Sequence, residues 1–314
     1  MRSPTYSDVV DAAERINPYV HRTPVFTSRF FDDVVGAEIF FKAENLQKVG
    51  AFKARGATNA VLALSDADAE RGIVTHSSGN HGQAVAYAAG IRSIPAVVVM
   101  PDHAPRVKID AVAAYGAEIV LCAQAEREST LRRIQSESGA VVIHPFDDPD
   151  VIAGQGTASL EFVEQVEGLE TIVTPIGGGG LLSGASLVGE RYGIEVVGAE
   201  PEIVDDAYRS LRDGVRYGPT GQLSVGDGLL TGIGELAFEI LRSHSRHVLT
   251  VSEEEIVDMV SVVATRMKLL IEPSAATAVA AVVRYRPRFA ARRVGIIISG
   301  GNMSLDGFAV SSDR

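Results

Sequence analysis

Short runs of mostly apolar residues alternate with longer stretches of helical periodicity along the 314-residue chain. The apolar runs predict strands at 37–42, 73–76, 96–100, 117–121, 171–176, 194–199 and 294–298. Helices are predicted between them, at 52–64, 81–89, 108–115, 126–138 and 181–192. Because most of these strands are continuously apolar, helices are expected to cover both of their faces. The pattern therefore predicts an α/β fold with open parallel sheets and helices on both faces.

Two segments outside this rhythm carry signals for the start of a helix. Ser252 and Glu255 have the Ser-x-x-Glu spacing of a capping box, ahead of a helix expected to reach Leu270. Near the other end of the chain, Ser7 is placed to cap a helix whose apolar residues include Val9 and Ile16.

Three polar or glycine-rich segments follow predicted strands, at 77–82, 177–180 and 299–302. Ligands of parallel sheets bind beyond the carboxyl ends of the strands, so these are candidate binding segments. The four glycines at 177–180 expose backbone N–H groups at the start of a helix, which suits a phosphate. A tight turn that only packs helix on strand is the alternative. The segment is not a P-loop, and it misses the Gly-x-Gly-x-x-Gly spacing of dinucleotide-binding loops.

Two further segments carry reactive or polar side chains. Lys53 follows Phe52 at the start of a predicted helix. Most lysines in such a position are solvated, but a buried lysine with a lowered pKa is the type that bonds covalently to a carbonyl compound. The 77–82 turn places hydroxyl, amide and imidazole groups where backbone N–H groups suit a carboxylate. Simple capping of the next helix by Ser78 or Asn80 is the alternative.

Together these segments resemble the fold type II pyridoxal-phosphate enzymes, specifically the serine/threonine dehydratases, serine racemases and threo-3-hydroxyaspartate ammonia-lyases. The resemblance runs from about residue 5 to Asn302. It rests on the segments 52–57, 77–83, 154–157, 175–181, 267–273 and 299–302. It implies a tryptophan synthase β-like fold with a large cofactor-binding domain, 1–69 and 149–314, and a small domain, 70–148. The chain departs from the pattern at Ala51, where most members carry serine.

The resemblance also assigns a cofactor, pyridoxal 5′-phosphate (PLP), and residues to bind it. These would be Phe52, Lys53, Asn80, Gly177, Gly178, Gly179, Gly180, Leu181 and Ser299. Lys53 would hold the cofactor aldehyde and, once freed, take the Cα proton of the substrate. The neutral hydroxyl of Ser299 would face the pyridine nitrogen and leave it largely unprotonated, which favours loss of a β-leaving group.

The implied reaction removes water and then ammonia from serine, threonine or 3-hydroxyaspartate, and leaves a serine or aspartate racemase activity open. Ser78 is the second candidate catalytic group, because it would lie on the face of the cofactor opposite Lys53. The candidate substrate-binding residues are Ser77, Ser78, Asn80, His81, Arg127 and Thr231. Arg127, with Thr231 as helper, would bind a second carboxylate. A helix-surface position for Arg127, between Glu126 and Glu128, is the alternative.

The acidic segment 200–206 supports two competing hypotheses. By resemblance, Glu200, the Val204 carbonyl and Asp206 would bind Mg²⁺ or Ca²⁺, with an exposed acidic turn as the alternative. Glu200 also lies twenty residues after Gly180, where a nicotinamide-binding fold has its ribose-binding acid. The rival function is therefore an NAD-dependent oxidoreductase that uses the Gly177–Gly180 loop and Glu200. A binding role without catalysis would require a buried Lys53 that holds no cofactor.

The resemblance implies a small amino-acid substrate as the partner, and composition argues against two other classes of partner. The net charge is −11 and no basic stripe is present, so nucleic-acid and anionic-membrane partners are not expected. Neither a signal peptide nor a stretch of ~20 apolar residues is found. The single cysteine, Cys122, is expected to pack as a small hydrophobe in a reducing compartment, rather than to act as a catalytic thiol. We expect a cytoplasmic homodimer without an appended regulatory domain, because only twelve residues follow Asn302.

Overall fold

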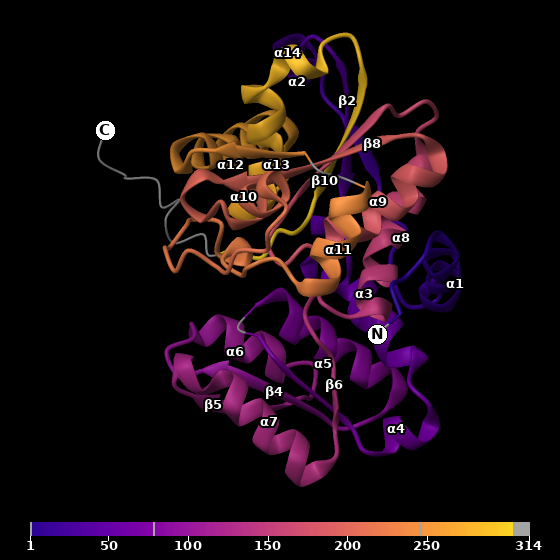
Figure 1. Ribbon diagram of the computed structural model, residues 1–314, viewed down its shortest axis with the longest axis vertical. Helices are drawn as coiled ribbons and strands as arrows, with labels where there is room; N and C mark the ends of the chain where they lie inside the picture. Colours follow the sequence, from indigo (N-terminus) through magenta and orange to yellow (C-terminus); the bar gives the residue numbers. More distant parts are fainter. Residues whose placement is uncertain (1, 78, 245–246, 304–314) are drawn as a thin grey trace.

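The computed structural model describes residues 2–77, 79–244 and 247–303 (Figure 1). Its strands form a six-stranded sheet of order β1-β2-β10-β7-β8-β9 and a four-stranded sheet of order β5-β4-β3-β6. In Figure 1 the smaller sheet and its helices form the lower half of the molecule, and the larger sheet lies in the upper half. The predicted α/β fold with two sheets is confirmed.

The large sheet is parallel except at one edge. Its strands are β1 (Val25–Thr27), β2 (Glu38–Ala43), β7 (Thr171–Pro175), β8 (Glu195–Pro201), β9 (Val248–Val251) and β10 (Arg293–Ile298). β10 pairs in parallel with both β2 and β7, so that Ile296 lies between Phe41 and Val173. The edge strand β1 runs antiparallel to β2. This three-residue edge strand was not predicted, because it is too short to show a period.

The small sheet is parallel throughout the part of the chain that the structure describes. Its strands are β3 (Ile73–His76), β4 (Ala96–Pro101), β5 (Glu118–Cys122) and β6 (Val141–Val142). The helices α5 (Asn80–Arg92), α6 (Arg106–Ala113) and α7 (Arg127–Ser138) connect them. The domain boundaries at 69/70 and 148/149 stay a prediction. Cys122 is a free, half-buried thiol at the end of β5, packed against a small apolar cluster.

The remaining helices lie around the large sheet, except the short helix 66–70, which precedes β3 and lies in the lower half of Figure 1. They are α1 (Tyr6–Ile16), α2 (Arg29–Val35), α3 (Lys53–Ala63), α4 (Asp66–Glu70), α8 (Pro149–Gln165), α9 (Gly180–Tyr192), α10 (Asp206–Asp213), α11 (Glu235–His244), α12 (Glu253–Met267), α13 (Pro273–Arg284) and α14 (Arg286–Phe289). Short 3₁₀ turns occur at Glu44–Leu46, Lys48–Gly50, Gln124–Glu126, Glu202–Val204 and Asp227–Leu229. No helix among the described residues is long and apolar enough to cross a bilayer.

The capping predictions had mixed outcomes. Ser252 does form a capping box, since Glu255 N donates to Ser252 Oγ at 3.2 Å and Ser252 N donates to Glu255 Oε2 at 2.8 Å. The helix nevertheless ends at Met267, because Lys268 adopts a left-handed conformation with φ 61°. The prediction for Ser7 was wrong. Thr5 is the N-cap residue of α1, and its backbone N–H donates to Asp8 Oδ2 at 2.7 Å.

Close contacts between three helices fix the position of α3. A methyl group built at Gly154 of α8 would lie 2.6 Å from the Cα of Gly56 in α3. One built at Gly184 of α9 would lie 2.5 Å from the backbone nitrogen of Gly156 in α8. Both distances are shorter than any Cβ contact allows, so only glycine lets these helices approach so closely. The helix that begins with Lys53 is therefore packed backbone to backbone on α8, which packs in the same way on α9.

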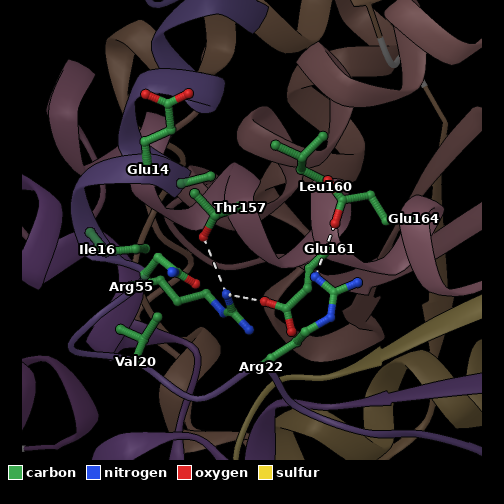
Figure 2. Close-up of a pocket in the computed structure, with 11 residues that line it drawn as sticks. Glu14, Ile16, Val20, Arg22, Arg55, Thr157, Leu160, Glu161 and Glu164 are labelled. Atoms are coloured by element: carbon green, nitrogen blue, oxygen red, sulfur yellow. Dashed lines mark hydrogen bonds and ion pairs between the residues drawn. The ribbon is translucent and has the colours of Figure 1, made fainter.

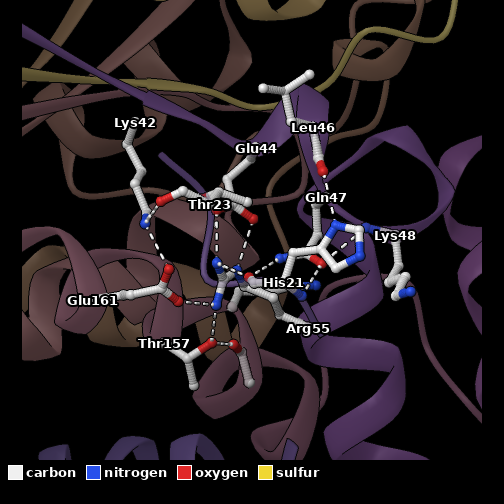
Figure 3. A network of polar contacts seen from close by, with 12 residues as sticks. His21, Thr23, Lys42, Glu44, Leu46, Gln47, Lys48, Arg55, Thr157 and Glu161 are labelled. Carbon is white, nitrogen blue, oxygen red and sulfur yellow. Dashed lines mark hydrogen bonds and ion pairs between the residues drawn. The ribbon is translucent and has the colours of Figure 1, made fainter. Parts of the chain in front are cut away.

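A buried ionic network lies under α3 (Figure 3). The Arg55 guanidinium donates to Glu44 at 2.7 and 2.8 Å and to Glu161 at 2.8 Å. Lys42 Nζ donates to Glu161 Oε1 at 2.7 Å. Residues two apart on a helix point in nearly opposite directions, so α3 presents Lys53 and Arg55 on different faces. The network holds two cations and two carboxylates, and it anchors the face of α3 away from the lysine.

A cavity of about 410 Å³ opens beside Arg55 (Figure 2). Its lining comes from α1, the loop that follows it, α3 and α8, and includes Glu14, Arg22 and Glu164. Neither Lys53 nor the 177–180 glycines contribute to the lining. This cavity is therefore not the site that the sequence predicts.

Candidate active site

Lys53 is partly buried at the first turn of α3. Its Nζ donates to the Pro145 carbonyl at 2.7 Å and lies 5.1 Å from the centre of the Phe52 ring. Burial lowers the pKa of Lys53 to about 8, although the nearby carboxylate of Glu272 opposes the shift. Lys53 is thus not a solvated surface lysine. It has the environment expected of an amine that reacts with an aldehyde.

The turn after β3 holds the polar side chains that the sequence singled out. Asn80 donates through Nδ2 to both carboxylate oxygens of Glu272 at 3.0 Å and accepts from Asn302 Nδ2 at 2.8 Å. It does not cap α5, whose N-cap residue is Gly79. Ser77 is half-buried, and its Oγ accepts from Gly79 N at 3.2 Å. Ser78 lies outside the described residues, so its catalytic role stays a prediction.

His81 is buried, and its Nε2 lies 3.1 Å from the Ile143 carbonyl. Burial holds the pKa of His81 well below its usual value, so the ring is neutral and Nε2 donates this bond. Nδ1 is then an acceptor, and it has no hydrogen-bond partner among the described residues. An acceptor does not bind a carboxylate. If His81 contributes to carboxylate binding, it does so through its backbone N–H.

Sequence reasoning missed Glu272, the carboxylate at the centre of these contacts. It is 5% exposed, and besides Asn80 it accepts from Asn302 N at 3.2 Å. Burial raises the pKa of Glu272 to about 7. It ties the start of α5 to the 299–302 segment, across the two halves of the chain. The only available signal was its place in the 267–273 segment of the family resemblance.

Ser299 is buried directly after β10. Its carbonyl accepts from Phe52 N at 2.9 Å, and the next residue, Gly300, forms a β-bridge with Ala51. These bonds hold Phe52 and Lys53 against the carboxyl end of the sheet. The structure therefore brings Phe52, Lys53, Asn80 and Ser299 to one region, and their roles toward the cofactor stay a prediction. Ala51 itself is fully buried in this bridge, where its small side chain packs without a polar contact.

The glycine segment 177–180 connects β7 to α9 and is buried throughout. Packing alone accounts for part of it: Gly179 has φ 92°, and a side chain at Gly178 would overlap the ring of Phe146. Thr231 lies beside the segment, with its Oγ1 3.4 Å from a Cβ built at Gly177. No side chain among the described residues caps α9. The first amides of a helix need an acceptor, so this buried N-terminus, together with Leu181, fits a phosphate.

Arg127 lies at the first turn of α7 and is half-buried. Its Nε is shielded from solvent and has no hydrogen-bond partner among the described residues. Its charge is close enough to His76 to help lower the pKa of that imidazole, which is lowered mainly by burial. His76 ends β3 and directly precedes Ser77. Arg127 and its neighbour Glu128, whose Oε2 is 3.4 Å from His76 Nε2, therefore both lie near the residue that precedes the 77–81 turn.

The predicted metal ligands are buried, so the alternative of an exposed acidic turn is wrong. Glu200 and Asp206 are each 1% exposed, and Val204 is 2% exposed. Glu200 accepts backbone N–H bonds from Ala207 at 3.1 Å and Tyr208 at 2.9 Å. Burial raises the pKa of Glu200 to about 9 and that of Asp206 to about 6. Within the described ranges, however, no three acidic, histidine or cysteine side chains are grouped closely enough to hold a metal ion.

Comparison with known proteins decides the family. The profile described as "Pyridoxal-phosphate dependent enzyme" matches residues 16–300 of the chain. The chain belongs to the pyridoxal-phosphate-dependent enzymes. This enzyme is 46% identical over 310 residues to the beta-hydroxyaspartate dehydratase of Paracoccus denitrificans, covering 98% of each chain. It is 43% identical to the L-threo-3-hydroxyaspartate ammonia-lyase of Saccharomyces cerevisiae, covering 98% of this chain and 95% of that one.

Solved structures agree with these relatives. The crystal structure of the serine racemase from Dictyostelium discoideum superposes with a TM-score of 0.93 at 45% identity, covering 97% of this enzyme and 100% of that chain. The predicted family, fold type and PLP cofactor are confirmed, and the predicted metal ion stays a prediction. The nicotinamide alternative finds no support.

Proposed function

We propose that this enzyme is an ammonia-lyase for small β-hydroxy amino acids and that it uses L-threo-3-hydroxyaspartate at least as efficiently as L-serine. The observation that carries the substrate preference is Arg127, whose shielded Nε lacks a partner among the described residues next to the 77–81 turn. Two relatives at 46% and 43% identity bear names that contain hydroxyaspartate. Relatives named serine racemase support a racemase side activity.

The residues around Lys53 suit the first step of such a reaction. When bound, PLP withdraws electrons from the substrate and makes its Cα proton acidic. The pKa of about 8 leaves part of the Lys53 amine neutral near physiological pH, so Lys53 can accept that proton. The bond to Pro145 O fixes the direction of Nζ. Ser299, Asn80 and the amides at the start of α9 would hold the pyridine nitrogen, the 3-hydroxyl and the phosphate of PLP.

Substrate selection depends on how the enzyme binds the α-carboxylate and the group attached to the β-carbon of the amino acid. The backbone amides at the start of α5 suit the α-carboxylate, which all three candidate substrates share. Only hydroxyaspartate adds a second carboxylate, and a guanidinium can bind it through two parallel hydrogen bonds. With serine or threonine this gain is absent, and Arg127 keeps an unsatisfied donor. Thr231 is exposed and lies beside Gly177, so its helper role is better suited to the phosphate than to the β-carboxylate.

A divalent cation is a further part of the proposal. Glu200 and Asp206 bury two carboxylates whose mutual repulsion adds to the cost of burial and raises the pKa of Glu200. A Mg²⁺ or Ca²⁺ ion held by Glu200, Asp206 and the Val204 carbonyl would remove that cost and keep both groups ionised. Asp206 Oδ2 also accepts from Ile233 N at 3.1 Å, two residues after Thr231. The ion would therefore stabilise the loop beside the glycine segment. A homodimer and a cytoplasmic location are proposed with it, on resemblance to the family.

The test compares catalytic efficiency on three substrates. We expect Arg127→Ala to lower kcat/KM for L-threo-3-hydroxyaspartate by ~1–3 kcal/mol more than for L-serine or L-threonine. Arg133→Ala is the matched control, because Arg133 lies on the same helix and is paired with Glu137 at the surface. Arg133→Ala should change kcat/KM only slightly, and by the same factor for all three substrates. If Arg127→Ala affects the three substrates alike, or if hydroxyaspartate is the poorest substrate of wild type, the substrate preference is wrong.

A further inference from the structure

Four consecutive residues form the connection that leaves the small sheet after β6 and leads to α8; we call 144–147 the linker segment. Its shape is set by His144, whose Nδ1 accepts from Asp147 N at 2.8 Å. Burial lowers the pKa of His144 to about 4, so Nδ1 keeps this acceptor role at neutral pH. The His144 ring also packs edge-on against Phe146, with 4.7 Å between ring centres. The linker segment is thus a defined turn.

Each of the next three residues contacts a different part of the active site. The carbonyl of Pro145 accepts the bond from Lys53 Nζ at 2.7 Å. The ring of Phe146 lies directly against Gly178, and its backbone oxygen lies 3.1 Å from a Cβ built at Gly180. The linker segment therefore contacts the lysine amine and the glycine segment at the same time.

Asp147 extends this contact to α11. Its carboxylate accepts the first three backbone amides of that helix, from Glu235 and Leu236 at 2.9 Å and from Ala237 at 3.3 Å. A helix is usually capped by the residue just before it. Here that residue is Gly234, and the cap comes from a residue 88 positions away in sequence from Glu235. A side chain at Gly234 would overlap the Asp147 carboxylate, so the glycine makes room for this long-range cap.

α11 in turn touches the glycine segment from the other side. Gly234 N donates to the Gly178 carbonyl at 3.0 Å. A Cβ built at Gly179 would lie 2.8 Å from the Cβ of Ala237. In Figure 1, α11 lies next to α9 where the two halves of the molecule meet. Gly178 and Gly179 are therefore enclosed between Phe146 and α11, and Asp147 is the group that joins these two walls.

We propose that Asp147 is a positioning residue for cofactor binding. By capping α11 from the linker segment, it holds Phe146 and α11 at a fixed separation around the glycine segment, and so fixes the amides that bind the phosphate. Loss of the cap leaves three backbone amides at the start of α11 without their acceptor and lets the two walls separate. The proposal rests on PLP binding at the glycine segment, but it does not depend on which amino acid is the substrate.

The test measures the dissociation constant for PLP on purified protein, together with thermal stability. We expect Asp147→Ala to raise Kd about 3- to 30-fold, the equivalent of one lost N-cap, and to speed PLP loss from the holoenzyme on dialysis. Asp147→Asn keeps an accepting oxygen and should recover most of the affinity. Gly234→Ala perturbs the same contact from the helix side and should also raise Kd. Inorganic phosphate should stabilise the Asp147→Ala apoprotein less than it stabilises wild-type apoprotein.

Ser252→Ala is the matched control, because Ser252 caps α12 through its own side chain and lies outside the site. It should lower the melting temperature by a similar amount and leave the Kd for PLP unchanged. The proposal is overturned if Asp147→Ala lowers stability as Ser252→Ala does while Kd stays at the wild-type value. Should Asp147→Ala fail to fold, the same comparison is made with Gly234→Ala, and an unchanged Kd in that variant overturns the proposal. Wild type that binds no PLP would instead contradict the family assignment.

Discussion

Glu161→Gln is expected to be among the most destabilising single substitutions in this enzyme that change no side-chain volume. Glu161 bridges the two buried cations of the network in Figure 3, Lys42 at 2.7 Å and Arg55 at 2.8 Å. The side chains of Lys42 and Arg55 are 0% and 1% exposed, so bulk water screens their charges little. The variant would bury two cations against the single carboxylate of Glu44.

The magnitude follows from this charge count. Removing one partner of a buried ion pair costs about 3–5 kcal/mol, because the other charge is left uncompensated. Lys42 limits the loss. Burial already lowers its pKa, and without Glu161 the pKa of Lys42 falls further, so Lys42 can become neutral. We therefore expect about 3 kcal/mol at neutral pH. At a pH between the lowered pKa of Lys42 in the folded variant and the normal lysine pKa, the unfolded variant binds more protons than the folded one. The stability of the variant therefore recovers as pH rises through this interval.

Urea unfolding of wild type and Glu161→Gln, at neutral and at alkaline pH, measures the effect. Glu164→Gln is the matched control on the same helix. Its carboxylate pairs with Arg22 at the surface, where both side chains are at least half exposed, and should contribute less than about 1 kcal/mol. Lys42→Met combined with Glu161→Gln should cost less than the sum of the two single variants. Equal destabilisation by Glu161→Gln and Glu164→Gln would refute the reasoning.

Three other outcomes are expected. Lys53→Ala should abolish keto-acid production and racemisation, because the base and the covalent anchor are lost together, while the circular dichroism spectrum stays that of wild type. Full keto-acid production by the variant would exclude Lys53 as the catalytic base. The rate at which apoprotein binds PLP should increase as pH rises through about 8, because only the neutral Lys53 amine attacks the aldehyde. Stopped-flow absorbance measures this rate, and a rate that does not depend on pH would contradict the role of the neutral amine. EDTA should lower the melting temperature, and added Mg²⁺ or Ca²⁺ should restore it. At a hundredfold excess of the ion over Kd, the gain in the free energy of unfolding is about 2.7 kcal/mol. Asp206→Ala should mimic EDTA, and an unchanged melting temperature would exclude a stabilising ion.

The sequence predicted the sheets better than the helices that pack on them. Continuous apolar runs such as 96–100 and 294–298 are too short to be buried helices, and they form β4 and β10. α8 was not predicted, because Gly154 and Gly156 interrupt its pattern and lower its helix propensity. α13 was missed because residues 274–282 are all buried, so it lacks the polar face on which a helical period depends.

In the site, the residues that belong to local sequence motifs could be predicted, and the residues whose contacts are distant in sequence could not. Lys53, the 177–180 glycines and the 77–81 turn carry local motifs, and the structure places them together. Asp147 carries no motif, because its capping bonds join it to a helix that begins 88 residues later. Glu272 precedes a proline at the start of α13 and looks like an ordinary helix start in sequence. Neither its burial nor its bonds to Asn80 can be predicted from neighbouring residues.

The glycine contacts between α3, α8 and α9 also constrain how the enzyme can evolve. A side chain at Gly154 would meet the Cα of Gly56, and one at Gly184 would meet the backbone of Gly156, so a substitution at either position displaces a helix. The contacts between α3, α8 and α9 therefore resist change by single substitutions. New substrate preferences must arise instead in parts that do not share this packing, such as the helix of Arg127 beside the small sheet. Relatives with different substrate names are then expected to differ mainly there, and to inherit the helix glycines together.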